Sequence, residues 1–258
     1  MRLVSLTCSN TEIVGALGRG DLLVGCDDYS DWPEAVVAGL PRVGKDLDID
    51  VEKVAALAPD LVLASLTVPG HEKVVAALEE AGLPVLVLAP TSLEDIYEDI
   101  RTVADRLGVA DHGEAIVHRM REAIGRGSDV PEAERPRILV EWWPKPVIVP
   151  GRRSWVTDLI DAAGGLNPWA DRDQESTPVT DEEVRAARPD AVVVAWCGVP
   201  FEKYRTEIVT RRPGWQEVPA LVNGQVHCIP EAWLGRPGPR LVSGFAALAD
   251  LVAALREA

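Results

Sequence analysis

Short apolar runs alternate with amphipathic segments through the first third of this chain. The predicted strands are residues 2–6, 22–25, 61–64 and 85–88. The predicted helices are residues 11–17, 51–58 and 72–81. These helices end at Gly18, Pro59 and Gly82, because glycine suits the left-handed turn after a helix and proline cannot continue one. The alternation predicts an α/β fold with a mostly parallel sheet and right-handed crossovers.

A longer helical pattern without glycine follows at residues 92–107, and a second helix is predicted at 111–124. Its apolar positions recur every three or four residues, which is typical of one face of a helix. We predict that it connects two α/β halves, and a long surface helix of one domain is the alternative. The predicted domains are residues 1–90 for the first lobe, 91–135 for the connecting and linker helices, and 136–258 for the second lobe.

The second half of the chain repeats the first. EKVAALAPDLV at residues 52–62 returns as EEVRAARPDAV at 182–192, with six identical positions at an offset of 130. Each copy predicts a helix, a Pro-Asp stop and an apolar strand. The other predicted elements are strands at 137–141 and 225–229 and helices at 155–163, 202–210 and 239–256. We infer two similar lobes with a cleft, the alternative being chance recurrence of a common unit.

Charge and hydropathy argue against a nucleic-acid-binding protein and against a membrane-spanning one. A net charge of −15 opposes nucleic-acid binding, because phosphates require a basic surface. The hydrophobic fraction of 47% is ordinary for a globular protein, and no apolar stretch reaches the roughly 20 residues of a membrane span. Met1 and Arg2 lead into the first strand and not into a signal-peptide core. We therefore expect a cytoplasmic protein or the mature form of an exported one.

Motifs for catalysis and metal binding are lacking in the sequence. It has no GxSxG, GxxxxGK[ST] or GxGxxG motif. The four histidines are not spaced as metal ligands usually are. They are His71, His112, His118 and His227. The cysteines, for which we predict free buried thiols, are Cys8, Cys26, Cys197 and Cys228. Cys197 has no evident base beside it. We predict no enzyme, no metal site and no catalytic cofactor.

Ligands of open parallel sheets bind outside the carboxyl ends of the strands. The predicted strand ends of the first half are residues 7–10, 28–32 and 65–67, and those of the second half are 142–143, 196–198 and 231–236. Five of the eight tryptophans fall in these segments, namely Trp32, Trp142, Trp143, Trp196 and Trp233. Such rings suit a broad planar ligand, and we expect about two or three to contact it while the others pack in the core.

Several segments resemble the substrate-binding proteins of metal-chelate ABC importers. They are RLVSLTCSNTEIVGALGRGDLLVG, DDYSDWP, PRVG, VEKVAALAPDLVLAS and RPGPRLVSG, and the resemblance runs from Arg2 to Leu255. DYSDWP and RPGPR resemble most the cobalamin-binding branch. Cys8 stands where a proline is usual in the family.

The resemblance implies two Rossmann-like lobes joined by one long rigid helix, as in class III periplasmic binding proteins. It implies a monomer outside the cytoplasm that binds cobalamin or a related corrinoid between its lobes and delivers it to an ABC-type permease. The implied ligand contacts are Tyr29, Ser30, Trp32, Gly44, Ser65, Leu66, Trp143, Trp196, Trp233 and Arg236. The implied permease-docking residues are Glu72 and Glu202, each opening a helix and again 130 residues apart.

Two other functions remain open at this stage. A ferric siderophore or haem is the first, although anionic siderophores require basic groups, of which the strand ends offer mainly Lys45 and Arg236. Haem requires an axial ligand, for which Tyr29 is available. A cytoplasmic corrinoid-handling protein is the second. In a corrinoid carrier, His71 or His227 remains a possible cobalt ligand.

Overall fold

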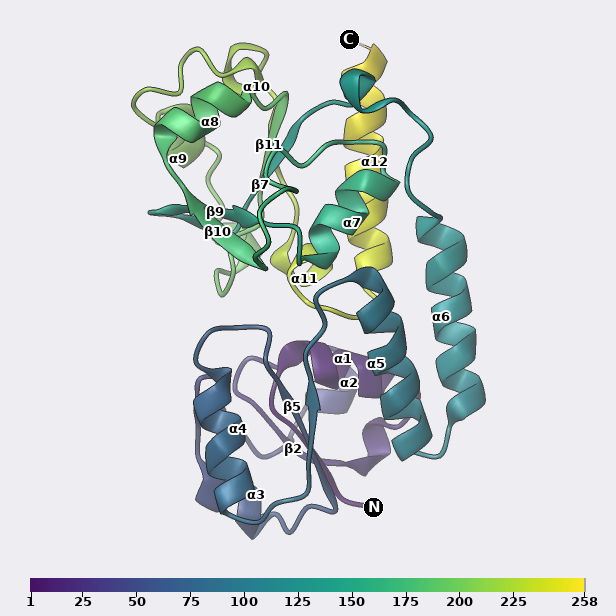
Figure 1. The fold of residues 1–258 in the computed structure, drawn as a ribbon. Coiled ribbons are helices and arrows are strands. Elements are labelled where there is room, and N and C mark those ends of the chain that lie inside the picture. The colour runs from purple at the N-terminus through teal and green to yellow at the C-terminus, as the bar shows by residue number, and fades with distance from the viewer. Residues whose placement is uncertain (258) are drawn as a thin grey trace. The chain divides into compact units, whose positions relative to one another are not determined.

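The computed structural model describes residues 1–257 and contains two compact units (Figure 1). Unit 1 comprises residues 1–90 and 94–119, and unit 2 comprises residues 91–93 and the chain from residue 120 onward. The chain passes from unit 1 to unit 2 inside α6 (Ala110–Ile124), between Arg119 and Met120. Within residues 1–257, no helix has the length and apolar character needed to cross a membrane.

Unit 1 is built on a parallel sheet of order β2-β1-β5-β6. Its strands are β1 (Leu3–Ser5), β2 (Leu23–Cys26), β5 (Leu61–Ser65) and β6 (Val85–Leu88). β5 is buried along its whole length, as expected for a strand covered on both faces. α1 (Cys8–Ala16) contacts β1 and β5, whereas α4 (His71–Glu80) contacts β5 and β6. The predicted parallel sheet is confirmed for this unit.

The remaining elements of unit 1 include a 3-10 turn, a short helix and a hairpin that were not predicted from the sequence. They are the 3-10 turn η1 (Gly20–Leu22), α2 (Glu34–Val37), α3 (Val51–Ala56), α5 (Leu93–Arg106) and the hairpin of β3 (Gly44–Lys45) and β4 (Asp48–Ile49). The hairpin was not predicted, because its strands are too short to show a period. α1 begins at Cys8, three residues before the predicted start, because Thr7 is the extended N-cap and its carbonyl accepts from the Thr11 amide.

Unit 2 contains a parallel sheet of order β12-β11-β7 and an antiparallel sheet of order β10-β9-β8. The parallel strands are β7 (Ile138–Glu141), β11 (Ala191–Val194) and β12 (Val226–Cys228). The antiparallel strands are β8 (Trp143–Pro144), β9 (Val147–Pro150) and β10 (Ser176–Val179). The antiparallel sheet was not predicted, and each of its strands contains a proline, which removes a ladder donor. β8 and β10 are edge strands and Pro150 ends β9, so the prolines are tolerated.

Two short helices of unit 2 were not predicted from the sequence, and one predicted helix is divided in two. The helices of unit 2 are α7 (Trp155–Ala162), α8 (Asp181–Ala187), α9 (Glu207–Thr210), α10 (Pro219–Val222), α11 (Glu231–Leu234) and α12 (Leu241–Glu257), with 3-10 turns η2 (Glu132–Glu134) and η3 (Phe201–Lys203). The helix predicted at 202–210 is wrong, since η3 and α9 are separate. Tyr204 lies between them with extended backbone, and its hydroxyl donates to the Trp196 carbonyl at 2.9 Å.

The sequence repeat is also a structural repeat. α3 and β5 in unit 1 correspond to α8 and β11 in unit 2. The Asp60 carboxylate accepts from the Arg2 amide at 2.6 Å, and the Asp190 carboxylate accepts from the Arg137 amide at 2.7 Å. In both units the aspartate of the Pro-Asp stop therefore fixes the start of the neighbouring first strand.

Helix caps and turns repeat at the same offset. Asp50 accepts from a backbone amide at the start of α3, and Thr180 does so at the start of α8. Ala58 and Arg188 both adopt left-handed backbone, with φ of 45° and 48°, and these two are the only non-glycine residues between 1 and 257 with positive φ. Shared strain at equivalent positions strengthens the inference that the two halves arose by duplication.

Candidate functional site

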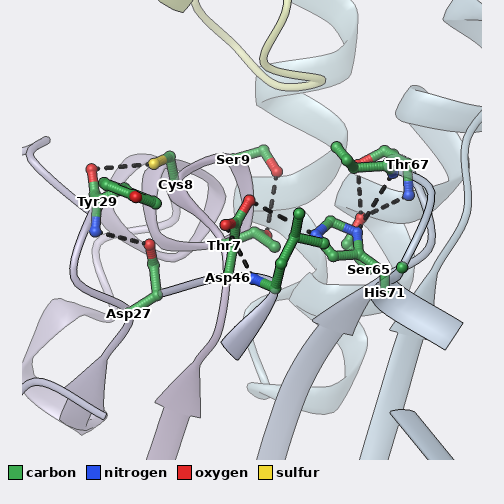
Figure 2. A network of polar contacts seen from close by, with 12 residues as sticks. Thr7, Cys8, Ser9, Asp27, Tyr29, Asp46, Ser65, Thr67 and His71 are labelled. Atoms are coloured by element: carbon green, nitrogen blue, oxygen red, sulfur yellow. Dashed lines mark hydrogen bonds and ion pairs between the residues drawn. The ribbon is translucent and has the colours of Figure 1, made fainter. Parts of the chain in front are cut away.

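The carboxyl ends of β1, β2 and β5 in unit 1 carry a band of polar side chains and exposed apolar ones. Figure 2 shows the polar groups of this edge, with Thr7, Cys8, Asp27 and Tyr29 on one side and Ser65, Thr67 and His71 on the other. The exposed large apolar residues on these loops are Tyr29, Trp32, Leu47, Leu66 and Val68. They lie on the connection after β2, in the turn of the β3–β4 hairpin and on the connection after β5. The first and third connections leave the carboxyl ends of parallel strands, where ligands of open parallel sheets bind.

The loop of residues 27–33, here called the Tyr29 loop, follows β2 and has an exposed ring on a fixed backbone. The Tyr29 side chain is 51% exposed. Its amide donates to Asp27 Oδ2 at 2.9 Å, and its carbonyl accepts from Cys8 Sγ at 3.0 Å (Figure 2). Trp32 in the same loop is 49% exposed. Both rings are exposed to solvent, and their contact with a ligand stays a prediction.

Ser30 differs from its predicted role as a ligand contact. Ser30 is 2% exposed, and its hydroxyl donates to Asp27 Oδ1. The hydroxyl oxygen of Ser30 also lies 2.7 Å from Thr11 Oγ1. Thr11 Oγ1 in turn donates to Ser5 Oγ at 2.8 Å. The Ser30 hydroxyl is therefore hydrogen-bonded inside unit 1, where it helps to fix the Tyr29 loop.

The connection from β5 to α4 brings His71 against the β3–β4 hairpin. His71 is 3% exposed, its Nδ1 accepts from the Val68 amide at 3.3 Å, and its Nε2 lies 3.6 Å from Asp46 Oδ2. Among residues 1–257, no group of three or more His, Cys, Asp or Glu could hold a metal ion. Burial leaves His71 unsuited to reach a cobalt atom, and its Nε2, beside the hairpin, has no hydrogen-bond partner in the part of the chain that the structure describes.

Gly44, Ser65 and Leu66 lie on this same edge. Ser65 ends β5, is 4% exposed, and its hydroxyl lies 3.0 Å from Thr67 Oγ1, whereas Leu66 is 40% exposed. Gly44 has φ of 111°, and its carbonyl accepts from the Asp28 amide at 2.8 Å. Leu66 therefore presents a side chain, while Gly44 presents backbone that links the hairpin to the Tyr29 loop.

The corresponding edge of unit 2 is held by a buried ion pair. Glu141 ends β7 and is 0% exposed, and its two oxygens accept from Arg212 Nη1 at 2.7 Å and Nη2 at 3.0 Å. Trp196 Nε1 donates to the same carboxylate at 2.9 Å, and the Arg212 guanidinium lies 4.2 Å from the centre of the Trp215 ring. Neither Arg212 nor Trp215 was singled out from the sequence.

Trp196, predicted as a ligand contact, is instead a core residue. It is 4% exposed and packs in the hydrophobic cluster of unit 2 that includes Tyr204 and Trp215. Trp143, the next predicted contact, is 43% exposed on edge strand β8. Of these two rings, the structure leaves only Trp143 open to a ligand.

Trp233 and Arg236 lie at the other end of this edge, on and after α11. Trp233 is half-buried, and Arg236 Nε donates to Glu231 Oε2 at 3.3 Å. α11 approaches α12 closely at Gly244, where a Cβ would overlap the Trp233 carbonyl. Gly244 therefore permits the position of Trp233.

The thiols of the chain are free, but their burial differs from prediction. Cys26 is buried, Cys8 and Cys228 are half-buried, and Cys197 is exposed. Desolvation by the surrounding protein, and secondarily the Glu231 carboxylate, raises the pKa of Cys197 to about 12. Although part of the residue is open, its thiol stays protonated at neutral pH and is a poor nucleophile.

The two glutamates expected to dock a permease are both exposed, in different local settings. Glu72 lies in the first turn of α4, and its Oε2 accepts from the Gly70 amide at 2.8 Å. Its own amide and that of Gly70 hold the pKa of Glu72 below its usual value, so the carboxylate stays charged. Glu202 lies in η3 beside the exposed Phe201, and so it does not open an α-helix as predicted.

Asp27 and Arg42 were not identified from the sequence as site residues. Arg42 Nη1 donates to the carbonyls of Asp27 at 2.8 Å and Ser30 at 2.7 Å. The only available signal was their occurrence in CDDYSDWP and PRVG, and nothing local indicates that Asp27 is buried. Asp27 is 0% exposed, and its amide donates to the carbonyl of Ser5 at the end of β1 at 3.0 Å.

This chain is similar to known proteins over most of its length. The model of the family described as periplasmic binding protein matches residues 3–232. An uncharacterized ABC transporter substrate-binding lipoprotein of Bacillus subtilis is 28% identical over 97% of this chain and 79% of its own length. The vitamin B12-binding protein of Vibrio cholerae is 27% identical over 93% of this chain and 84% of its own length.

Among solved structures, the periplasmic heme-binding protein RhuT from Roseiflexus sp. RS-1 is similar to this chain. It aligns with a TM-score of 0.79 and 29% identity, over 99% of this chain and 98% of RhuT. The fold class predicted from the sequence, with its parallel sheets, is confirmed. Proteins similar to this chain thus include binders of different metal chelates.

Proposed function

Because the chain belongs to the periplasmic binding protein family, we propose that it binds cobalamin or a related corrinoid and delivers it to an ABC-type permease. Substrate binding for an ABC importer is the activity common to the family relatives. The proposed binding is non-catalytic, and it places the protein outside the cytoplasm, where such receptors meet their ligands. The corrinoid is cargo and not a cofactor.

The exposed aromatic rings at the strand ends carry this proposal. Tyr29, Trp32 and Trp143 are each between 43% and 51% exposed, although burial of such rings is strongly favourable. Rings left in water at the carboxyl ends of parallel strands are suited to a broad, largely apolar ligand.

The proposed ligand contacts change accordingly. Ser30 and Trp196 are removed, because their side chains are occupied inside their own units. The proposed contacts are Tyr29, Trp32, Gly44, Ser65, Leu66, Trp143, Trp233 and Arg236. Leu47 and Val68 are exposed on the same loops and are added to this set.

Haem is the second candidate ligand, and one observation favours it. RhuT, at 29% identity, is described as a heme-binding protein, and Tyr29 offers an exposed phenol of the kind that ligates haem iron. A corrinoid is the first candidate, because vitamin B12-binding proteins of several species are similar over more than nine-tenths of this chain.

A binding experiment with three chelates tests the proposal. Purified protein is mixed separately with cyanocobalamin, hemin and ferrichrome, dialysed, and examined by visible spectroscopy and calorimetry. Retention of cyanocobalamin with micromolar or tighter affinity is expected. Retention of hemin or ferrichrome alone would replace the corrinoid by that ligand, and no retention of any would overturn chelate binding.

Replacement of Trp143 by alanine is expected to weaken cyanocobalamin binding by about 1–3 kcal/mol, because an exposed ring that becomes buried on binding acts as an anchor. The measurement is calorimetric titration of the variant beside wild type. Val222→Ala is the matched control, since Val222 is 66% exposed in unit 2 but lies outside the proposed contacts. Equal affinity of Trp143→Ala and wild type would remove Trp143 from the site.

The double replacement of Glu72 and Glu202 by alanine is expected to leave cyanocobalamin affinity unchanged and to abolish most ligand-stimulated ATP hydrolysis by the reconstituted transporter. Both carboxylates are exposed, so they are available to basic groups of a permease. The control is Glu79→Ala with Glu207→Ala, which removes two exposed glutamates from the same neighbourhoods. Undiminished stimulation in the first variant would exclude these residues from docking.

A further inference from the structure

We propose that Asp27 is a positioning residue that holds the Tyr29 loop in its ligand-binding conformation, with Cys8 and Arg42 as its partners. This inference rests on the proposed function and adds residues that do not themselves meet the ligand. Asp27 acts through Tyr29, whose ring is the group presented to the chelate.

The two oxygens of Asp27 have separate tasks. Oδ2 accepts from the Tyr29 amide at 2.9 Å, and Oδ1 accepts from the Ser30 hydroxyl. A carboxylate that bonds backbone two residues ahead closes an Asx turn. Asp27 is 0% exposed, and desolvation raises the pKa of its carboxyl. Burial of this group costs free energy, which its two bonds to the loop offset only in the loop's present shape.

The carbonyl groups of the loop are held from the opposite side. Cys8 Sγ donates to the Tyr29 carbonyl at 3.0 Å, and Arg42 Nη1 donates to the Ser30 carbonyl at 2.7 Å. Arg42 Nη1 also donates to the Asp27 carbonyl at 2.8 Å. Asp27, Tyr29 and Ser30, which lie in no helix or strand, thus have backbone groups bonded by the side chains of Cys8, Arg42 and Asp27 itself.

This arrangement leaves the ring of Tyr29 exposed while its backbone amide and carbonyl are held by hydrogen bonds. Ordering a free loop when a ligand binds would oppose binding, and a loop ordered beforehand avoids that loss. Removal of Asp27 should therefore weaken affinity by about tenfold, as the ordering of a few residues would.

A double-mutant cycle separates positioning from general destabilisation. Cyanocobalamin affinity is measured for wild type, Asp27→Ala, Tyr29→Ala and the double variant. Asp27→Ala is expected to weaken affinity about tenfold in the presence of Tyr29 and less than about twofold in its absence. Equal losses in both backgrounds, or no loss in either, would overturn the proposal. Asp21→Ala, which removes an exposed aspartate of the same unit, is the control.

Two further variants keep the test decisive if Asp27→Ala folds poorly. Asp27→Asn retains one acceptor oxygen in a side chain of the same shape, and should recover part of the affinity. Cys8→Ala leaves Asp27 intact and removes only the thiol donor to the Tyr29 carbonyl. Its smaller loss of affinity should also vanish in the Tyr29→Ala background. Circular dichroism and thermal unfolding confirm that each variant is folded.

A ligand-independent measurement distinguishes failure of this inference from failure of the proposed function. Exchange of the Tyr29 amide hydrogen, followed by NMR in the ligand-free protein, should accelerate at least about tenfold in Asp27→Ala and less in Asp27→Asn, whose side chain keeps one acceptor oxygen. If wild type retains no chelate but exchange accelerates, the proposed function fails and the positioning stands. If exchange is unchanged, the positioning fails whatever the ligand.

Discussion

Replacement of Arg212 by methionine is expected to lower the free energy of unfolding of unit 2 by about 3–5 kcal/mol. Arg212 is 8% exposed and its partner Glu141 is 0% exposed, so the substitution leaves a carboxylate buried without its counter-charge. The variant also loses the guanidinium stacked on Trp215. Urea denaturation followed by tryptophan fluorescence measures the effect, since every tryptophan except Trp32 belongs to unit 2.

A second variant identifies the unpaired charge as the cause. Arg212→Met combined with Glu141→Gln removes the buried charge but keeps an oxygen that accepts from Trp196 Nε1. This double variant is expected to recover more than half of the lost stability, because it leaves no uncompensated ion. A double variant no more stable than Arg212→Met would show that packing, and not charge, accounts for the loss.

Replacement of Gly44 by alanine is expected to destabilise unit 1 by about 2–4 kcal/mol and to abolish most ligand binding. Gly44 has φ of 111°, where a side chain is strained. A Cβ there would also overlap the Asp48 carbonyl across the β3–β4 hairpin and lie 3.2 Å from the Asp50 amide. Since Gly44 bonds the Tyr29 loop through Asp28, a displaced hairpin would move that loop as well.

Gly39→Ala is the matched control for this effect. Gly39 also has positive φ, at 80°, but nothing lies within 4 Å of the Cβ that alanine would add. It should therefore lose only about 1 kcal/mol, the cost of left-handed backbone for a residue with a side chain. Thermal unfolding and cyanocobalamin titration compare the two variants. Equal losses would mean that the overlap in the hairpin is relieved without consequence.

Much of the fold could be predicted because its signals are local. The apolar run 61–64 and the stop at Pro59 specify β5 and the end of α3 without knowledge of the rest of the chain. The antiparallel sheet was not predicted, and each of its strands contains a proline. Pro144, Pro150 and Pro178 lie on edge strands or at a strand end, where a missing amide donor is tolerated.

The candidate site was predicted less well, because the sequence shows residue types and not exposure. Trp143 and Trp196 both follow predicted strands and have the same chemistry, yet one is 43% and the other 4% exposed. Trp196 bonds Glu141, which is far away in the chain and is itself paired with Arg212. Trp196 also bonds Tyr204, from which an irregular turn separates it. No periodicity over a short window contains that information.

The sequence alone determined the duplicated helix-stop-strand unit and the parallel sheets, because periodicity, stop residues and caps act within a few neighbouring residues. The tertiary structure alone decided which strand-end groups face solvent. In the folded protein Ser30 and Trp196 are buried, whereas Tyr29 and Trp143 are exposed. Asp27 and Arg42 form hydrogen bonds with the backbone of the Tyr29 loop. Burial and hydrogen-bond partners come from residues far apart in the chain, and only packing brings them together.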